Sequence, residues 1–141
     1  MNKEDFCTYS QAVRLKKLGF DWECIAKYGA EPDGKPILVG STVFVFRNSE
    51  EKGRDATAPT LAHAQKWLRE EHSLYVDIST HGKHCWTTNI VGYSDEDIPK
   101  GYLHPVNVEV FDLFEQALSA GLDVALELLE ENSKKLTRYG M

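Results

Sequence analysis

The last third of the chain carries the pattern that most constrains the fold. Asp112 and Glu115 have the spacing of an N-terminal capping box, so we predict a helix that begins there and persists to about Glu131. Its apolar residues recur at steps of three and four, as on one face of an α-helix: Phe114, Leu118, Leu122, Ala125 and Leu129.

This apolar stripe is wider than the roughly 100° that a one-sided surface helix needs. Ala117, Val124 and Leu128 lie beside it and extend it. Either two neighbouring elements or another subunit must cover the helix. We predict a homodimer through this helix, with Val124 and Leu128 among the contact residues.

Two earlier helices have clear boundary signals. Thr8 and Gln11 have capping-box spacing, and Gly19 suits the left-handed position that ends a helix, which predicts a helix over residues 9–18. Pro59 and Thr60 open a second helix, with Thr60 as N-cap and an end near residue 72. One face of it is apolar: Leu61, Ala64, Trp67 and Leu68.

The segments between these two helices are less regular. Residues 22–28 fit either a helical turn or a strand, and residues 37–46 fit two short extended pieces or one bulged strand. We place Val43 and Phe44 in the core. Residues 48–58 are polar and lack a periodic apolar residue, which predicts a flexible linker or exposed loop.

Two strands, residues 74–79 and 84–91, follow the second helix around a turn containing Gly82. The parity of the connecting loop decides which residues share a face. A two-residue loop would place Leu74, Val76 and Ile78 opposite another set of residues: Cys85, Thr87 and Asn89. We prefer an odd loop. The odd loop places those three residues on one face with Trp86, Thr88 and Ile90.

Residues 92–105 contain two Gly, two Pro and three consecutive acids, and they predict a long surface excursion. Val106, Val108 and Val110 then alternate as a third strand. The order from residue 59 is therefore αβββα. We predict an α+β fold: a two-layer sandwich of one antiparallel three- to five-stranded sheet with helices on one face.

A length of 141 residues suits a single domain. We expect residues 1–47 to pack on the αβββα core of residues 59–141, with residues 48–58 as the linker. No segment is apolar and long enough to cross a membrane, and no secretory signal opens the chain. Cys7, Cys24 and Cys85 have no CxxC spacing, which suits reduced thiols and a cytoplasmic location.

The net charge is −6, and all of the excess acidity lies in residues 59–141, which hold seven basic and thirteen acidic side chains. This balance disfavours nucleic acid as a partner. The αβββα order matches the double-stranded RNA-binding domain, and we keep a nucleic-acid-binding module as the alternative function. Asp112 and Glu115 would repel phosphate where such a domain needs lysines.

Three blocks of the sequence resemble a known family. They are YSQAVRLKKLGFDWECIAKYG, APTLAHAQKWLREEHSLYVDI and FDLFEQALSAGLDVALELLEE. The chain is similar there to a family of small uncharacterised proteins encoded by phages, prophages and other mobile elements of gut bacteria. The resemblance departs at residues 48–55 and 92–105. It implies an accessory role in a mobile element and supplies no catalytic residues.

The clearest candidate for chemistry is the group His81, His84 and Cys85, with His104 nearby as a fourth metal ligand. The His-x-x-His-Cys spacing matches no standard zinc pattern, and neighbouring strand residues point to opposite faces. We therefore interpret this group as a polar turn beside a small thiol. Glycine-rich nucleotide loops and a GxSxG nucleophile motif are absent from the sequence, so we expect no cofactor.

Tyr93 and Tyr102 fall in the predicted surface excursion beside Asp95 and Asp97. An exposed loop with aromatic and acidic residues is typical of protein recognition. Our leading hypothesis is thus a non-enzymatic module that binds an unidentified host or phage protein. An enzyme dependent on a metal or on a Cys–His pair is the third and weakest hypothesis.

Overall fold

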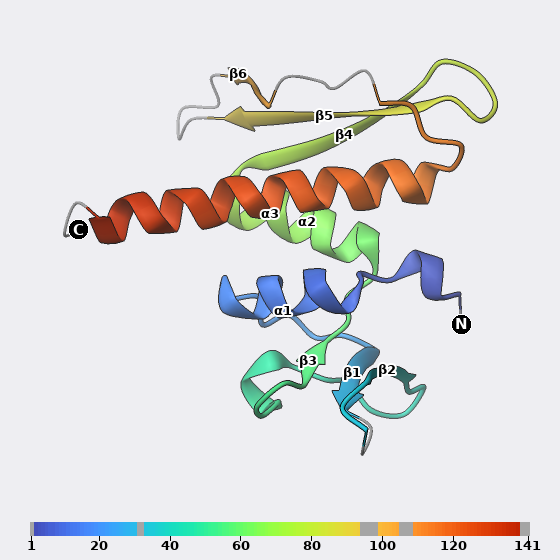
Figure 1. Cartoon of the computed structure of the whole chain (residues 1–141), viewed down its shortest axis with the longest axis vertical. Helices are drawn as coiled ribbons and strands as arrows, with labels where there is room; N and C mark the ends of the chain where they lie inside the picture. Colours follow the sequence, from blue (N-terminus) through green and yellow to red (C-terminus); the bar gives the residue numbers. More distant parts are fainter. Residues whose placement is uncertain (1, 31–32, 94–98, 105–108, 139–141) are drawn as a thin grey trace. The chain divides into compact units, whose positions relative to one another are not determined.

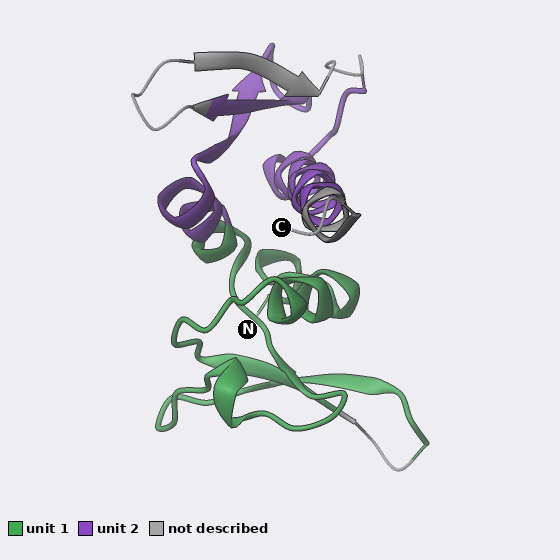
Figure 2. Cartoon of the chain, turned by 90° about the vertical axis from the view of Figure 1, so that its left-hand side faces the viewer, with its two compact units in different colours: residues 1–64 green, residues 65–141 purple. Residues whose placement is uncertain are grey.

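A computed structural model of the whole chain has an α+β fold, which confirms the predicted class. The chain folds as two compact units, residues 1–64 and 65–141, and each is described by itself (Figure 2). The structure describes residues 2–30, 33–93, 99–104 and 109–138.

Unit 1 contains a small antiparallel sheet with strand order β2-β1-β3, so that β1 lies between the other two strands (Figure 1). A helix, α1, precedes the sheet in sequence. The elements in chain order are η1 (Lys3–Asp5), α1 (Tyr9–Lys17), β1 (Ala26–Ala30), β2 (Pro36–Gly40), η2 (Asn48–Glu50) and β3 (Ala56–Thr57).

Both predicted boundary signals of α1 are confirmed. The Gln11 backbone N–H donates to Thr8 Oγ1 at 3.2 Å, and the Thr8 N–H donates to Gln11 Oε1 at 2.9 Å, which completes the capping box. At the other end Gly19 has a φ of +97°, and the Phe20 N–H donates to the Leu15 carbonyl at 3.0 Å. This is the Schellman arrangement, and it fixes the path of the chain toward β1.

We expect Thr8→Ala to lower the free energy of unfolding by about 1 kcal/mol, because the Gln11 N–H loses its acceptor. Urea titration measures the difference. Ser10→Ala is the matched control: Ser10 is exposed in the first turn, and its change should stay within about 0.5 kcal/mol. Equal effects of the two substitutions would show that the capping box does not stabilise the helix.

β1 and β2 form a hairpin with Ala26 opposite Gly40 and Tyr28 opposite Leu38. One face of the hairpin packs on the buried side chains of Phe6 and Ala58. Residues 22–28 therefore end in a strand, which settles the ambiguity of that segment. Of the two expectations for residues 37–46, the structure has two pieces: β2 ends at Gly40, and Phe46 forms an isolated bridge with Cys24.

The expectation of a flexible linker or exposed loop at residues 48–58 is wrong at both ends of the segment. Asn48 is buried, and its Nδ2 donates to the Phe20 carbonyl at 2.7 Å. Its Oδ1 accepts from the Thr57 N–H at 2.9 Å, and Ala56 and Thr57 form the buried strand β3. A buried amide anchors this segment, whereas the sequence argument considered only apolar anchors.

The helix α2 (Leu61–His72) begins in unit 1 and continues in unit 2. Thr60 Oγ1 accepts from the His63 N–H at 3.1 Å, which confirms Thr60 as the N-cap. The predicted end at His72 is also confirmed, since Ser73 has a φ of +52° and leads directly into the next strand.

Unit 2 contains a second three-stranded antiparallel sheet with order β4-β5-β6. Its strands are β4 (Leu74–Thr80), β5 (Trp86–Tyr93) and β6 (Pro99–His104). The register confirms the odd loop, because residues 81–85 connect Thr80 to its partner Trp86. Val76 lies opposite Ile90, and both are buried.

The third strand lies earlier in the sequence than predicted. β6 occupies part of the expected surface excursion. Of the three valines predicted to form the strand, Val106 and Val108 lie outside the described residues. Val110 is not in a strand, and its side chain is 50% exposed. Pro99 is the first residue of this edge strand, a position where its missing N–H costs little. The αβββα order holds. The strands of unit 1, however, form a separate sheet and do not extend this one.

The last helix, α3 (Phe114–Arg138), packs on β4 and β5 (Figure 1). The predicted capping box at Asp112 and Glu115 is wrong: the helix begins later, and the Leu113 N–H donates to Gln116 Oε1 at 3.2 Å. The helix also continues seven residues past Glu131. Over its described part, the buried apolar side chains are Ala117, Leu118, Leu122, Ala125, Leu126 and Leu129.

Candidate functional site

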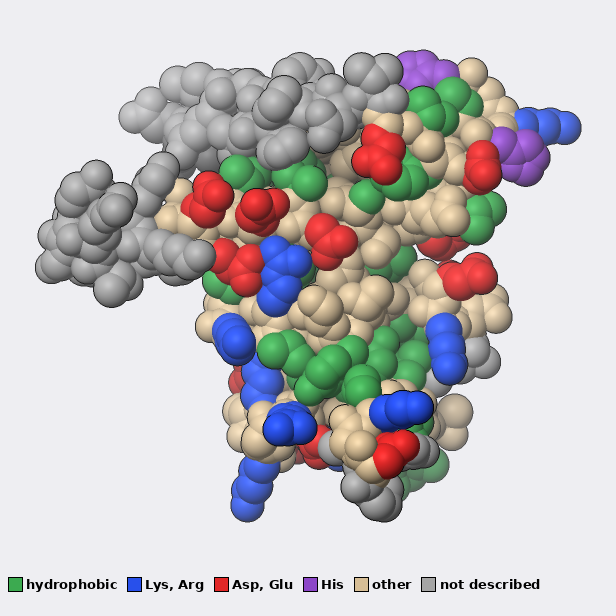
Figure 3. Space-filling view, viewed as in Figure 1, with side chains coloured by type: hydrophobic (Ala, Val, Ile, Leu, Met, Phe, Trp, Pro, Cys, Tyr) green, Lys and Arg blue, Asp and Glu red, His purple; other side chains and the backbone are tan. Residues whose placement is uncertain are grey.

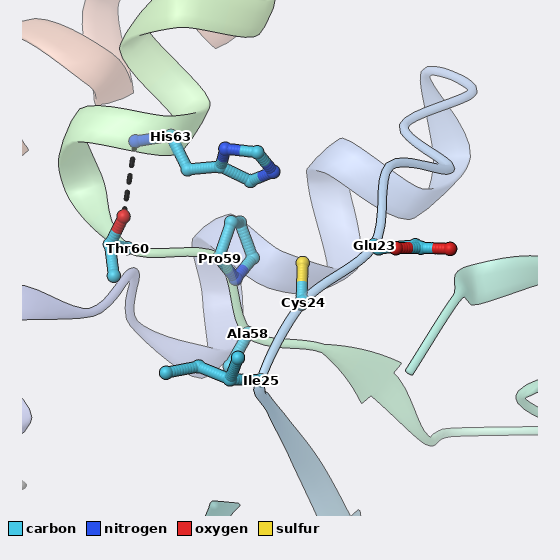
Figure 4. A pocket seen from close by; sticks show the side chains of 7 residues that line it. All are labelled: Glu23, Cys24, Ile25, Ala58, Pro59, Thr60 and His63. Carbon is cyan, nitrogen blue, oxygen red and sulfur yellow. Dashed lines mark hydrogen bonds between the residues drawn. The ribbon is translucent and has the colours of Figure 1, made fainter. Parts of the chain in front are cut away.

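Unit 1 has a pocket of about 250 Å³ at the start of α2. The side chains of Cys24 and His63 face the same space, with Pro59 between the segments that carry them (Figure 4). Two chain segments line the pocket: Glu23, Cys24 and Ile25 from the approach to β1, and Ala58, Pro59, Thr60 and His63 from the opening of α2.

His63 is held by aromatic packing. Its ring lies edge-on to Phe20, with centroids 5.9 Å apart, and at 5.2 Å from the ring of Trp22. Its Nε2 is buried and has no hydrogen-bond partner among the described residues. Sequence reasoning did not single out His63, because a lone histidine in a helix carries no motif.

Cys24 does not supply a reactive thiolate to this pocket. The residue is 4% exposed, and its thiol donates to the Trp22 carbonyl at 3.5 Å. Burial raises the pKa of the Cys24 thiol to about 11, and the Thr57 hydroxyl lowers it only in part. The thiol is therefore protonated at neutral pH, which is the state of an inert core cysteine and not of a nucleophile.

The predicted metal-ligand candidates lie on the β4–β5 connection and on β6. His81 and His84 are exposed, Cys85 is half-buried, and His81 Nε2 lies 3.3 Å from Thr87 Oγ1. His104 pairs with Ile90 in the β5–β6 register. In the part of the chain that the structure describes, His, Cys, Asp and Glu side chains form no group of three or more that would hold a metal ion.

Two of the predicted partner-binding residues of unit 2 lie in strands. Tyr93 ends β5 and Tyr102 lies in β6, where it pairs with Val91, so both belong to the sheet and not to a surface excursion. Asp95 and Asp97 lie outside the described residues. On α3, Val124 and Leu128 are half-buried.

The feature of unit 1 that most resembles a protein-binding site is a set of exposed apolar side chains, which we call the apolar surface. Val43 is 80% exposed, Phe44 68% and Val45 54%, so the prediction that Val43 and Phe44 belong to the core is wrong. The full set in the described part of unit 1 is Ile25, Ile37, Val39, Val43, Phe44 and Val45.

The three most prominent of these side chains stand on a hydrogen-bonded loop, residues 41–46, which we call the apolar loop. Ser41 Oγ accepts from the Val43 N–H at 3.1 Å and from the Phe44 N–H at 2.9 Å. Both ends of the loop are fixed to the approach to β1. The Ser41 N–H donates to the Ile25 carbonyl at 2.9 Å, and Phe46 exchanges two backbone hydrogen bonds with Cys24.

Figure 3 shows basic side chains over unit 1 and acidic ones along the drawn face of unit 2. In the sequence, residues 65–141 hold seven basic and thirteen acidic side chains, whereas residues 1–64 hold nine of each, so only unit 2 has a net charge. The acidic balance of unit 2 disfavours contact of its helices with phosphate.

Comparison with known proteins gave no match to a family model, to a curated protein or to a solved structure. Among the described residues, no helix has both the length and the apolar character needed to span a bilayer.

Proposed function

We propose that this chain is a non-enzymatic module that binds a partner protein through the apolar loop of unit 1. The observation that carries the proposal is the exposure of Val43, Phe44 and Val45 on a loop that is hydrogen-bonded at both ends. Contiguous exposed apolar side chains of this kind mark interaction sites. The partner is a host or phage protein, as the resemblance to a family from mobile elements implies.

The geometry of the loop suits binding. Burial of each large apolar side chain contributes on the order of 1.5–3 kcal/mol. Because the Ser41 hydroxyl and the paired Cys24 and Phe46 backbones already order the loop, little further conformational entropy is lost when a partner covers it. Three such side chains are enough to dominate a small interface.

The chemistry of the pocket gives no support to an enzymatic role. Cys24 supplies the thiol that lines it, and the raised pKa of Cys24 keeps that thiol protonated. The pocket therefore offers a protonated thiol and a histidine packed between aromatic rings, which do not make a nucleophile–base pair.

The experiment is a quantitative pull-down from lysate of the native host with the tagged full chain, run with and without nuclease. The test variant is V43S/F44S, and the matched control is V110S/L113S, which removes two exposed apolar side chains of unit 2. We expect a discrete protein with the wild type and the control, and at least about tenfold less of it with V43S/F44S.

Equal recovery with V43S/F44S and with the control would refute the apolar loop as the binding site. Loss of all bound material on nuclease treatment would instead favour the alternative, a nucleic-acid-binding module. That alternative rests on the αβββα order of α2, β4, β5, β6 and α3.

The sequence also predicts a homodimer through α3, with Val124 and Leu128 as contact residues. Both side chains are half-buried within the single chain. This contact stays a prediction: V124K/L128K would weaken such a dimer, and it changes no residue of unit 1.

A further inference from the structure

β2 is an edge strand, and no described strand pairs with its outer side. The sheet order is β2-β1-β3, so only β1 pairs with β2 among the described strands. The Ser41 N–H donates to the Ile25 carbonyl, and hydrogen-bonded pairs alternate along an antiparallel ladder. The backbone groups of Ile37 and Val39 therefore point toward β1, whereas those of Leu38 and Gly40 point away from it.

The exposure of β2 agrees with this assignment. Gly40 consists only of backbone and is exposed, so its outward-facing groups are accessible. Ile37 is 38% exposed and Val39 45%, on the face opposite the packed Leu38. Natural edge strands are usually protected by charges or bulges. β2 reads Pro-Ile-Leu-Val-Gly and carries no charge.

We propose that β2 pairs with β2 of a second copy of this chain, antiparallel, about a two-fold axis at Leu38. In this register the two Leu38 residues exchange both backbone hydrogen bonds. The Gly40 N–H donates to the Pro36 carbonyl of the other copy, and this pair also repeats by symmetry. Pro36 has no N–H, so the Gly40 carbonyl opposite it accepts no bond from the other strand and stays open to water at each end of the junction.

The strand is self-complementary in this register, which argues for a second copy over an unrelated strand. Val39 lies opposite Ile37 of the other copy, so apolar side chains meet across the junction. Lys35, the nearest charged residue, falls opposite Ser41, and no like charges face each other. The result is a continuous six-stranded sheet with the order β3-β1-β2-β2-β1-β3.

The hydrogen bonds of the junction come from β2, and the exposed side chains of Val43, Phe44 and Val45 take no part in it, so the two proposals fail independently. Sedimentation of the full chain over a concentration series tests the pairing with two matched variants, I37E/V39E and I37K/V39E. Both place a carboxylate beside Lys27, the β1 partner of Val39, and differ only at residue 37, which lies opposite Gly29. Any change in the stability of unit 1 that comes from a carboxylate beside Lys27 is therefore the same in both variants.

The first variant sets like charges directly opposite each other across the junction, and the second sets opposite charges there. We expect a wild-type dimer, a retained dimer for I37K/V39E, and a dissociation constant at least about tenfold higher for I37E/V39E. Amide hydrogen exchange should slow at Leu38 and Gly40 as the concentration of the wild type rises. A monomeric wild type at all concentrations, or equal dissociation constants for the two variants, would overturn the proposal.

Discussion

Asn48→Ala is expected to lower the free energy of unfolding by about 3 kcal/mol, the largest effect of any polar substitution that we predict for unit 1. The buried amide of Asn48 joins two segments, because Nδ2 donates to the Phe20 carbonyl at 2.7 Å and Oδ1 accepts from the Thr57 N–H at 2.9 Å. The substitution removes both of these hydrogen bonds and leaves the buried Thr57 N–H without its acceptor, and the loss of a bond to a buried group costs about 1–3 kcal/mol.

Urea unfolding followed by tryptophan fluorescence measures this loss. Ser49→Ala is the matched control, since Ser49 is the exposed neighbour and its backbone N–H, which the substitution keeps, donates to Asp21 Oδ1. The free energy of unfolding of Ser49→Ala should differ from that of the wild type by less than about 0.5 kcal/mol. If both substitutions shifted the midpoint equally, the Asn48 amide would not be the anchor of β3.

Gly121→Val is expected to cost about 2–3 kcal/mol in unit 2, because it forces extra volume into the contact of α3 with the sheet. A Cβ at Gly121 would lie 2.5 Å from Thr88 Cγ2 and 2.5 Å from Val76 Cγ1. Both neighbours are β-branched residues of paired strands, so their side chains have few alternative rotamers. The hydroxyl of Thr88 is moreover bonded to the Ala117 carbonyl at 2.6 Å.

A series at this position separates steric cost from helix propensity. Gly121→Ala gains about 1 kcal/mol of helix propensity, so it should destabilise unit 2 less than Gly121→Val does. Glu127→Ala, on the exposed side of α3, should leave the stability nearly unchanged. Thermal unfolding by circular dichroism ranks the three variants. A Gly121→Ala variant more stable than the wild type by the full propensity gain would show that α3 does not approach the sheet closely at Gly121.

The parts of the fold that follow local rules could be predicted from the sequence. Thr8 and Thr60 are N-caps because a hydroxyl is placed to accept from the N–H three residues later, and Gly19 ends α1 because it tolerates a positive φ. The register of β4 and β5 follows from alternation alone: placing Val76 and Ile90 on one face requires an odd loop.

The remaining parts depend on pairings between distant residues. Asn48 resembles any polar loop residue until its amide meets Phe20 and Thr57, and β6 begins at a proline that reads as a loop signal. The capping box predicted at Asp112 failed because Gln116, one residue beyond Glu115, bonds the Leu113 N–H instead.

The candidate site was missed for a related reason. Val43, Phe44 and Val45 form an apolar, β-branched and aromatic run, which is typical of a buried strand. The hydroxyl of Ser41 turns the chain at this point, so the side chains that the pattern assigns to the core face solvent. The hydrogen bonds of this turn distinguish an exposed loop from the buried strand that the apolar run predicts.

The most direct test of the apolar loop as a binding site is photocrosslinking in cells of the native host, with a benzophenone amino acid in place of Phe44. The same amino acid in place of Val110, an exposed position of unit 2, is the control. We expect a discrete crosslinked adduct with a second protein from position 44 and none from position 110. Absence of any adduct at position 44, or the same adducts from both positions, would contradict protein binding through the apolar loop.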